Sequence, residues 1–456
     1  MMDLVTHLKR KIRKYSDDPS STHHILIAIS GGVDSVVLTD VMLKTVLGTS
    51  NSIGLAHVNY GIRSDANEAE AFCSQIANQS NCQFHNVNFE FTSKGESFEK
   101  WARDVRYQYL SEIAHEYNYQ WILTAHHKDD QLETLFMRYS QKADWVTMQG
   151  IREQLGKIKR PFLDVDKSQL TKYAREHDLK WIDDPTNMDL VFLRNEIRHI
   201  ALPKTLRNEP GLPDYLFRLS ANAKRRFNRL VNQLDVGNLI IEYKKSDHVE
   251  ISKSEFLKMS DDKMKIVIKL LMTNYLGKAS ISLSGSHWAS FWQFIRNAST
   301  GTVFELSKDV FSIMDRKSLY LAKNKKEVGD RKKIESTCTT NWYNNQFRVE
   351  LLTGKHTPKS TDKKFAVITI NEFDKGVFIR RWKSGDNVKI NSGTHKVKIS
   401  DLFINHKIPV FKKWYYPVVV NKNDEILWVP GLKHASLIED VKANTKNNIK
   451  IECLWT

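Results

Sequence analysis

The stretch HHILIAISGGVDSVVLTDVML, residues 23–43, decides the fold of the N-terminal part of this chain. An apolar run at 25–29 predicts a buried strand, and the apolar periodicity of residues 36–47 predicts a helix after it. The turn between them is Ser30-Gly31-Gly32-Val33-Asp34-Ser35, where glycine lets backbone N–H groups approach an anion closely. The N-terminus of the helix adds its positive dipole end. The sequence therefore predicts a phosphate-binding loop.

This loop matches neither G-x-x-x-x-G-K-[ST] nor G-x-G-x-x-G, so a Walker ATPase and an ordinary dinucleotide fold both fit poorly. Asp34 is unusual here, because a carboxylate repels bound phosphate unless a cation lies between them, which favours Mg²⁺. The alternative is a Gly-Gly turn in which Ser30, Asp34 or Ser35 caps the helix. The loop alone leaves both interpretations open.

The rest of the N-terminal part has the pattern of βαβ units. Apolar runs at 52–59 and 121–125, with a weaker one at 82–89, predict strands, and helical periodicity fills residues 97–118 and 129–139. Strands that alternate with helices favour a parallel sheet. We therefore expect an α/β domain that binds its ligands at the carboxyl ends of the strands.

An acidic helix start, TAHHKDDQLET at residues 124–134, follows the last of these predicted strands. Asp130 and Glu133 are spaced i,i+3, so their carboxylates share one helical face and can converge on one cation, such as an ammonium group. Two other interpretations stay open: acidic residues that merely favour a helix N-terminus, and a metal site that uses His126 and His127.

Composition sets the broader limits. The chain has 456 residues, 41% hydrophobic and 27% charged, which fits a folded protein of two to four domains and excludes a disordered or collagen-like chain. A net charge of +16 favours a polyanionic partner at about even odds. No 18 consecutive residues are apolar, and the cysteines form no C-x-x-C pair, so we expect a protein of the reducing cytoplasm without a membrane partner. The four cysteines are Cys73, Cys82, Cys338 and Cys453.

Composition also shifts along the chain. Residues 204–271 have a helical and basic pattern, 303–321 resemble strands, and the charged segment 323–333 is the best linker. Short β-like runs follow it, at 365–370, 377–382, 417–420 and 426–429. We expect three domains: a parallel-sheet domain at 1–203, a mainly helical one at 204–330 and a small α+β, β-rich one at 331–456.

The block S-G-G-x-D-S after a buried strand resembles the loop of the N-type ATP pyrophosphatases, which split ATP to AMP and pyrophosphate while activating a carbonyl oxygen as its adenylate. Further motifs narrow the resemblance to the tRNA(Ile)-lysidine synthetase family. They are HVNYGIR at 57–63, E-x-x-A-R-x-x-R-Y at 99–107, the 124–134 motif, and DDPTN with F-x-R-N-x-I-R at 183–198. Looser similarity resumes at 380–386, 398–403, 408–409 and 428–431.

The resemblance implies an enzyme that joins L-lysine to C2 of the wobble cytidine of tRNA(Ile) with a CAU anticodon. The reaction passes through an adenylated cytidine and releases AMP and pyrophosphate. ATP and Mg²⁺ are the implied cofactors, tRNA is the implied nucleic acid in place of DNA, and a second copy of the chain is a candidate partner.

The resemblance also implies roles for particular residues. Those implied to bind ATP are Ser30, Gly31, Gly32, Val33, Asp34, Ser35 and His57, with Mg²⁺ held by Asp34 through the phosphates. Those implied to bind lysine or tRNA are Arg106, Asp130, Glu133, Arg194 and Arg198. The implied catalytic residues are Asp34, Arg106, Asp130 and Glu133.

The chain departs from the family pattern at two places. Tyr60 stands where a histidine is common, and the stretch YSQKADWVTMQG at 139–150 has a single glycine where relatives are glycine-rich. Three basic runs are candidates for RNA contacts, although for each run alone a solvated surface is the better explanation. They are Lys224-Arg225-Arg226, Arg380-Arg381 and Lys412-Lys413-Trp414.

Three other functions are weighed. A tRNA thiolase of the same superfamily generally needs paired cysteines, which this chain lacks. A non-catalytic nucleotide- or RNA-binding protein has no need of the carboxylates Asp34, Asp130 and Glu133. A metal-dependent hydrolase would be built on His126, His127, Asp129 and Asp130.

Overall fold

The structure is a computed structural model, and its chain divides into two compact units. The N-terminal unit comprises Met1–Gln233 and Ser282–Ser286, and the C-terminal unit comprises Leu234–Ile281 and His287–Thr456. The structure describes residues 3–455 except for 17–21, 48–50, 62–65, 92–97, 184–192, 245–246, 278–282, 308–309, 324–330, 336–338, 343–344, 353–362, 391–394 and 436–447.

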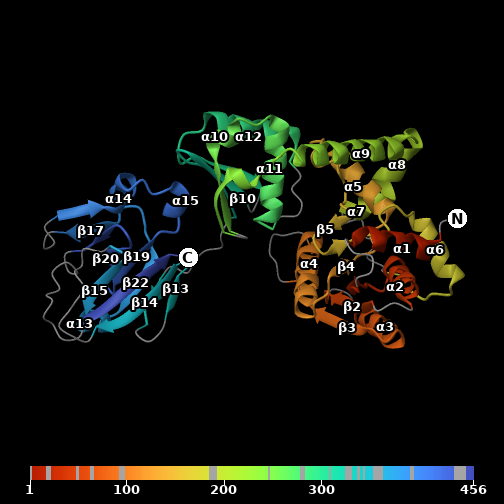
Figure 1. The fold of residues 1–456 in the computed structure, drawn as a ribbon, viewed down its shortest axis with the longest axis horizontal. Coiled ribbons are helices and arrows are strands. Elements are labelled where there is room, and N and C mark those ends of the chain that lie inside the picture. Colours follow the sequence, from red (N-terminus) through yellow and green to blue (C-terminus); the bar gives the residue numbers. More distant parts are fainter. Residues whose placement is uncertain are drawn as a thin grey trace. The chain divides into compact units, whose positions relative to one another are not determined.

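A six-stranded sheet organises the N-terminal unit, with the strand order β3-β2-β1-β4-β6-β5. Figure 1 labels β2, β3, β4 and β5 of this sheet. The first five strands in that order run parallel, and β5 pairs antiparallel at the edge. The predicted α/β domain with a parallel sheet is confirmed, as are its four predicted strands. The strands are β1 (His24–Ala28), β2 (Ser52–Asn59), β3 (Gln83–Asn88), β4 (Trp121–Leu123), β5 (Gln154–Leu155) and β6 (Ile158–Lys159).

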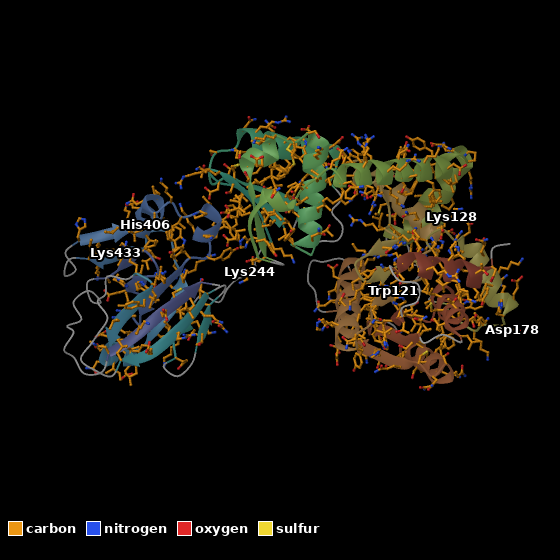
Figure 2. All side chains as sticks on the ribbon, in the orientation of Figure 1. Trp121, Lys128, Asp178, Lys244, His406 and Lys433 are labelled. Carbon is orange, nitrogen blue, oxygen red and sulfur yellow. The ribbon has the colours of Figure 1, made fainter. Side chains whose placement is uncertain are left out.

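Helices cover both faces of this sheet, as the alternating side chains of β1 show. Ile25 and Ile27 pack in one apolar cluster with residues of α1, α2 and α6, whereas Leu26 packs in another with residues of α4. Figure 2 labels Trp121 on β4 and Lys128 at the start of α5. The helices are α1 (Leu4–Tyr15), α2 (Val33–Val46), α3 (Ala66–Gln79), α4 (Phe98–Glu116), α5 (Lys128–Ser140) and α6 (Lys167–Glu176).

A second layer of helices packs on α5. It consists of α7 (Leu193–Glu196), a short π-helix at Ile197–Ala201, α8 (Leu202–Asn208) and α9 (Leu212–Val231). Leu212 and Leu216 of α9 lie one turn apart and share a buried cluster with Leu135 and Phe136 of α5. Both α8 and α9 thus fold with the N-terminal unit although they lie in the range 204–330, and the three-domain division stays a prediction.

The C-terminal unit begins with a five-stranded antiparallel sheet, β7-β8-β11-β10-β9. The prediction of continuous helix over 204–271 is wrong at β7 (Ile240–Lys244) and β8 (His248–Ser252). The register pairs Val249 with Leu321, so the strand forms against a partner about 70 residues later, which local periodicity cannot reveal. The other elements here are α10 (Lys253–Leu257), α11 (Asp261–Asn274), α12 (Gly285–Asn297), β9 (Val303–Ser307), β10 (Val310–Met314) and β11 (Ser318–Lys323).

Two further sheets complete the C-terminal unit and confirm its α+β character. The four runs predicted beyond the linker are strands β15 (Phe365–Thr369), β16 (Val377–Arg381), β19 (Pro417–Asn421) and β20 (Ile426–Val429). Of the predicted linker, residues 324–330 lie outside the described ranges. The remaining elements are β12 (Lys332–Lys333), β13 (Thr340–Trp342), β14 (Asn345–Leu352), α13 (Ile370–Asp374), β17 (Asn387–Ile390), β18 (His395–Lys398), α14 (Ile399–Asn405), α15 (Val410–Lys413), β21 (Lys433–His434) and β22 (Asn448–Trp455).

Among the residues that the structure describes, no helix combines the length and the apolar composition needed to cross a membrane.

Candidate active site

The predicted phosphate loop lies between β1 and α2 and is held by its own serines. Ser35 Oγ donates to Gly32 O at 2.9 Å, and the backbone N–H of Ser30 donates to Ser35 Oγ at 3.1 Å. Gly31 has φ of +84°, a conformation that side chains with a Cβ rarely adopt. Gly32 is the N-cap of α2, so the loop leads directly into the N-terminus of that helix. The loop therefore has the shape that an anion site requires.

Asp34, in the first turn of α2, reaches two basic side chains. Its Oδ2 accepts a hydrogen bond from Lys167 Nζ at 2.8 Å and lies 3.6 Å from His127 Nε2. Its Oδ1 is buried and has no hydrogen-bond partner among the described residues. A buried carboxylate oxygen without a donor indicates a missing ligand, and such an oxygen suits Mg²⁺.

Asp34 would hold this cation together with phosphate oxygens. In the described part of the chain, no group of three or more His, Cys, Asp or Glu side chains could hold a metal ion without further ligands. This also weakens the hydrolase alternative, because its four residues do not converge. His126 Nδ1 lies 2.9 Å from Thr124 Oγ1, and Asp129 accepts from the backbone N–H of Lys167 at 3.5 Å.

His127 and Asp130 cap the start of α5 reciprocally. The backbone N–H of His127 donates to Asp130 Oδ2 at 2.9 Å, and the backbone N–H of Asp130 donates to His127 Nδ1 at 3.4 Å. The other ring nitrogen, Nε2, faces Asp34. The helix-capping interpretation of Asp130 is therefore correct for one oxygen, which leaves Oδ1 for another partner.

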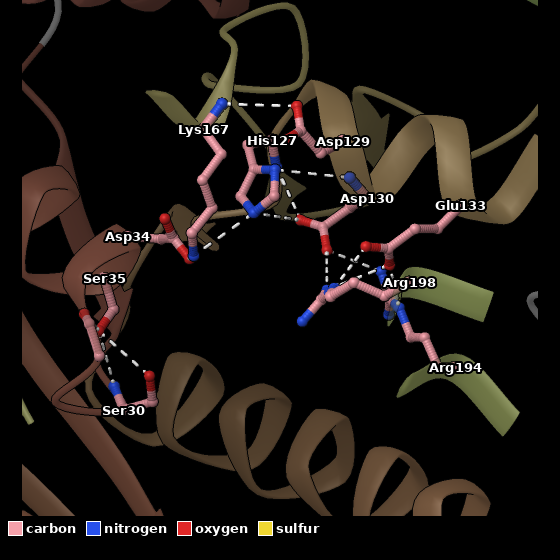
Figure 3. A network of polar contacts seen from close by, with 11 residues as sticks. Ser30, Asp34, Ser35, His127, Asp129, Asp130, Glu133, Lys167, Arg194 and Arg198 are labelled. Carbon is pink, nitrogen blue, oxygen red and sulfur yellow. Dashed lines mark hydrogen bonds and ion pairs between the residues drawn. The ribbon is translucent and has the colours of Figure 1, made fainter. Parts of the chain in front are cut away.

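Asp130 and Glu133 are both held by arginines from the next layer of helices (Figure 3). Arg194 donates to Asp130 Oδ1 at 2.7 Å and to Glu133 Oε2 at 2.9 Å. Arg198 forms a two-pronged pair with Glu133 at 2.6 and 3.1 Å. The structure thus brings these four predicted residues together. We call this set of two carboxylates and two guanidinium groups the acidic network.

The contacts of the network keep Asp130 and Arg198 charged. Burial alone would raise the pKa of Asp130, but His127 and Arg194 outweigh it and hold that pKa below its usual value. Burial likewise opposes the charge of Arg198, yet its hydrogen bonds to Glu133 raise the pKa of the guanidinium. In the structure the two guanidinium groups occupy the contacts that the two carboxylates offer to a cation.

The other predicted residues, His57 and Arg106, lie on β2 and α4. His57 is buried at the end of β2, with Nδ1 3.0 Å from the carbonyl of Ile29, which precedes the phosphate loop. Arg106 is half-buried on α4, with its guanidinium carbon 5.7 Å from the ring centroid of Tyr107. Arg106 forms no ion pair with any carboxylate of the described residues, so it is available to a ligand.

Tyr60, at the position where relatives often have histidine, makes structural contacts with α4. Its hydroxyl donates to the carbonyl of Ala102 in α4 at 3.2 Å, and its ring packs edge-on against Phe98 and Trp101. Burial raises the pKa of Tyr60, so the hydroxyl stays a donor. Tyr60 therefore anchors the helix that carries Arg106.

Side chains from two helices, α5 and α9, hold the glycine-poor segment 139–150 in place. Arg138 donates to Thr147 O at 2.6 Å, and Ser220 of α9 donates to Gln149 O at 3.0 Å. The one glycine, Gly150, has φ of +73°, where its backbone approaches the side chain of Gln131. Side-chain hydrogen bonds thus fix this segment without additional glycines.

The candidate RNA contacts differ in their burial and in their pairing. Arg380 is buried and paired with Asp386 and Asp424, so its assignment as an RNA contact is wrong. Lys412 pairs with Glu242, whereas Arg225 is exposed on α9. The motif segments 62–65 and 184–192 lie outside the described residues.

One site residue has no signal in the sequence. Lys167 begins α6 and belongs to no motif that marks an anion site. Lys167 reaches the site only because the fold brings distant segments together: Lys167 and Asp34 are 133 residues apart. Spacing along the chain could not have identified Lys167.

Comparison with known proteins gives one consistent result. Residues 4–205 match the family described as PP-loop domain, and residues 377–452 match the TilS substrate C-terminal domain. The tRNA(Ile)-lysidine synthase of Bacillus subtilis is 26% identical over 452 residues, which cover 94% of this chain and 93% of that protein. The enzyme of the same name from Streptococcus mutans is 29% identical over 439 residues, 91% and 92% of the two chains. The Thermotoga sp. protein of that name is 28% identical over 429 residues, 92% and 94% of the two chains.

Proposed function

Because the chain belongs to the tRNA(Ile)-lysidine synthase family, we propose that it joins L-lysine to C2 of the wobble cytidine of tRNA(Ile) with a CAU anticodon. ATP is split to AMP and pyrophosphate in the same cycle. The observation that carries this proposal is the position of His127, which contacts Asp34 of the phosphate loop and Asp130 of the acidic network. A nucleoside triphosphate and an amine can therefore be bound side by side.

In the first step, the cytidine O2 attacks the α-phosphate and pyrophosphate leaves. The turn Ser30-Gly31-Gly32-Val33-Asp34-Ser35 orients the departing phosphates with backbone N–H groups at the start of α2. Lys167 adds a positive charge beside Asp34. Asp34 Oδ1 would hold Mg²⁺, which when bound neutralises charge on the phosphates. His57 supports the loop from β2.

Asp130 and Glu133 first bind the lysine ε-ammonium in the contacts that Arg194 and Arg198 occupy without ligand, and so orient it. In the second step, the ammonium gives up a proton to the surroundings and the free amine attacks C2. The C2–O bond breaks, AMP leaves, and the attacking nitrogen gives up a further proton. The displaced arginines, with Arg106, then become donors for the lysine carboxylate or for RNA phosphate.

The RNA contributes binding energy away from the reacting atoms. The target cytidine must leave its base stack to reach the carboxyl ends of the strands, and backbone contacts elsewhere on the chain offset that cost.

A tRNA substrate places the reaction in the cytoplasm. The domain division 1–203, 204–330 and 331–456 and a homodimer belong to the same proposal, and limited proteolysis and light scattering test them.

The direct experiment incubates the purified chain with ATP, radiolabelled L-lysine and a tRNA(Ile) transcript that has the CAU anticodon, followed by nucleoside analysis. We expect one labelled nucleoside and equal amounts of AMP and pyrophosphate. Asp34→Asn and Asp130→Asn should abolish the product while tRNA binding persists, because both carboxylates act on the small substrates. Absence of label with the wild-type chain would refute the proposal.

The alternatives predict other outcomes. A thiolase would incorporate sulfur, but burial raises the pKa of Cys73 to about 12, which makes that thiol a poor nucleophile. Cys453 belongs to the C-terminal unit, its pKa is also raised to about 12, and Cys338 lies outside the described residues. A non-catalytic RNA-binding protein would bind the transcript and release no pyrophosphate.

A further inference from the structure

Five arginines lie near one another, and three of them contact Tyr107. We call these five residues the arginine cluster. Arg103 and Arg106 lie on α4, Arg138 lies on α5, Arg152 lies in the segment before β5, and Arg160 directly follows β6. Only Arg106 belongs to the proposed catalytic machinery. The other four have no role in the reaction as proposed above.

Contacts with Tyr107 and with backbone carbonyls hold the cluster. Arg160 donates through Nη2 to the Tyr107 hydroxyl at 3.1 Å and through Nη1 to the carbonyl of Arg152 at 2.7 Å. The guanidinium carbons of Arg103 and Arg106 lie 5.0 and 5.7 Å from the Tyr107 ring centroid. These positively charged groups lie close enough to repel one another: Arg103 and Arg152 add to the burial that lowers the pKa of Arg138 to about 10.

The positive charge of the cluster is not balanced by the protein. None of the five arginines pairs with a carboxylate in the part of the chain that the structure describes. Arg160 is only 2% exposed, and its Nε has no hydrogen-bond partner there. A buried guanidinium normally has all its donors satisfied, so this arrangement lacks an anion that the protein does not supply.

The cluster is open to a large ligand, and its charge indicates what kind. Arg106, Arg138 and Arg152 are half-buried and Arg103 is exposed, so the cluster can be reached from solvent. One guanidinium fork satisfies one carboxylate, so the single carboxylate of lysine would leave most of the cluster unbalanced. Several anionic groups at regular spacing, as in an RNA backbone, match it better.

We propose that the arginine cluster binds consecutive backbone phosphates of the tRNA loop next to the target cytidine. The inference rests on the proposed function for the identity of the RNA. The cluster borders the motif at 124–134, since the backbone N–H of Thr124 donates at 3.1 Å to the carbonyl of Lys159, the residue before Arg160. Contacts of this kind position the strand and carry no base specificity.

The test measures the dissociation constant of the full-length chain for the tRNA(Ile) transcript over a range of salt concentrations. Arg103→Gln and Arg152→Gln should each weaken binding and lower the slope of log K against log salt by about 0.7, as expected for one lost contact to a single strand. Arg152→Lys should retain the slope because it keeps the charge. Arg175→Gln, an exposed arginine of α6 outside the cluster, is the matched control.

The KM values for lysine and ATP should stay unchanged in both glutamine variants. A wild-type salt slope in Arg103→Gln and Arg152→Gln would overturn the proposal, and so would a raised KM for lysine with unaltered RNA binding. Arg103 is exposed, so its replacement tests the site without risk to the fold. Because binding is measured without turnover, reduced slopes in a chain that forms no lysidine would support the cluster while refuting the proposed reaction.

Discussion

The imidazole Nε2 of His127 lies 3.6 Å from Asp34 Oδ2, and this contact joins the phosphate loop to the start of α5. The same nitrogen is 3.4 Å from Asp130 Oδ2. Two carboxylates from segments almost a hundred residues apart therefore share one imidazole. In the proposed reaction, this shared contact would fix where the triphosphate and the amine lie relative to each other.

His127→Asn should separate the two roles of His127, which caps α5 and contacts both Asp34 and Asp130. Asparagine is a good N-cap, so α5 should keep its stability, whereas His127→Ala should lose about 1 kcal/mol in the free energy of unfolding. We expect kcat to fall about 100-fold in both variants, because misplaced reacting groups cost that much. Single-turnover kinetics and urea unfolding measure the two effects. His115→Gln, an exposed histidine of α4, is the control, and a wild-type rate in His127→Asn would contradict the role given to the contact.

Glu133→Gln should impair lysine binding selectively. The side chain of Glu133 is 5% exposed and receives three hydrogen bonds from Arg194 and Arg198, so its charge sets the affinity for a cation. Loss of one charged hydrogen bond costs about 2 kcal/mol, which corresponds to a rise in the KM for lysine of roughly thirtyfold. Steady-state kinetics at saturating ATP and tRNA measure this value.

The matched control for Glu133→Gln is Asp129→Asn, since Asp129 is an exposed carboxylate at the same helix start. We expect an unchanged KM for lysine in the control. An equal rise in both variants would mean that the general negative charge of the helix start, rather than the network, attracts the amine.

The sequence predicted the parallel-sheet domain well because the relevant signals are local. The apolar run before Ser30, the glycine turn and the acidic start of α5 each lie within a dozen residues. The acidic pair was predicted as a cation site, but its two arginine partners were predicted only as anion ligands. Whether Arg194 contacts a substrate or Glu133 depends on a helix that packs on α5 some 60 residues later along the chain.

The errors have the same origin. Arg380 resembles a basic surface residue in the sequence, yet β16 carries it into the protein and Asp424 arrives from the β19–β20 turn. Strand β8 lies in a helical, basic context and is fixed by pairing with β11. In each case a residue distant in sequence provides one of the contacts that bury the segment, although Asp386, which also pairs with Arg380, lies only six residues away.

Tyr60→Phe tests the anchor of α4. The variant keeps the ring contacts and loses the hydrogen bond to the Ala102 carbonyl, so the free energy of unfolding should fall by about 1 kcal/mol. The KM for tRNA should rise, because α4 carries Arg103 and Arg106. Tyr139→Phe is the control, since Tyr139 is exposed and its ring packs edge-on against that of Tyr215. Equal unfolding midpoints for the two variants would argue against an anchoring hydroxyl.

Gly150→Ala should destabilise the chain more than Gly156→Ala. Both glycines have positive φ, +73° and +57°, so each alanine costs about 1 kcal/mol of backbone strain. A Cβ at Gly150 would lie 2.5 Å from Gln131 Oε1, whereas at Gly156 it would meet nothing within 4 Å. Displacement of Gln131 also breaks its hydrogen bonds with Ile151, which adds about 2 kcal/mol. Urea unfolding of both variants gives the difference, and equal losses would mean that the segment adapts freely.

Asp164→Asn should reveal how α1 is tied to the sheet domain. Asp164 accepts from His7 at 3.2 Å and from Lys11 at 2.9 Å, and although burial opposes it, these partners hold the pKa of Asp164 well below its usual value. A carboxyl group whose pKa is lower in the folded chain stabilises the fold above its unfolded pKa, about 4, and this contribution decreases as the pH falls below that value.

The difference in unfolding free energy between wild type and Asp164→Asn should therefore be constant from pH 6 to 8, at about 1 kcal/mol or less because the group is half exposed. It should shrink below pH 4. Urea titrations at several pH values measure it, with Glu176→Gln on the exposed face of α6 as the control. A difference that grew on acidification would mean that protonated Asp164, rather than its ion pairs, holds α1 in place.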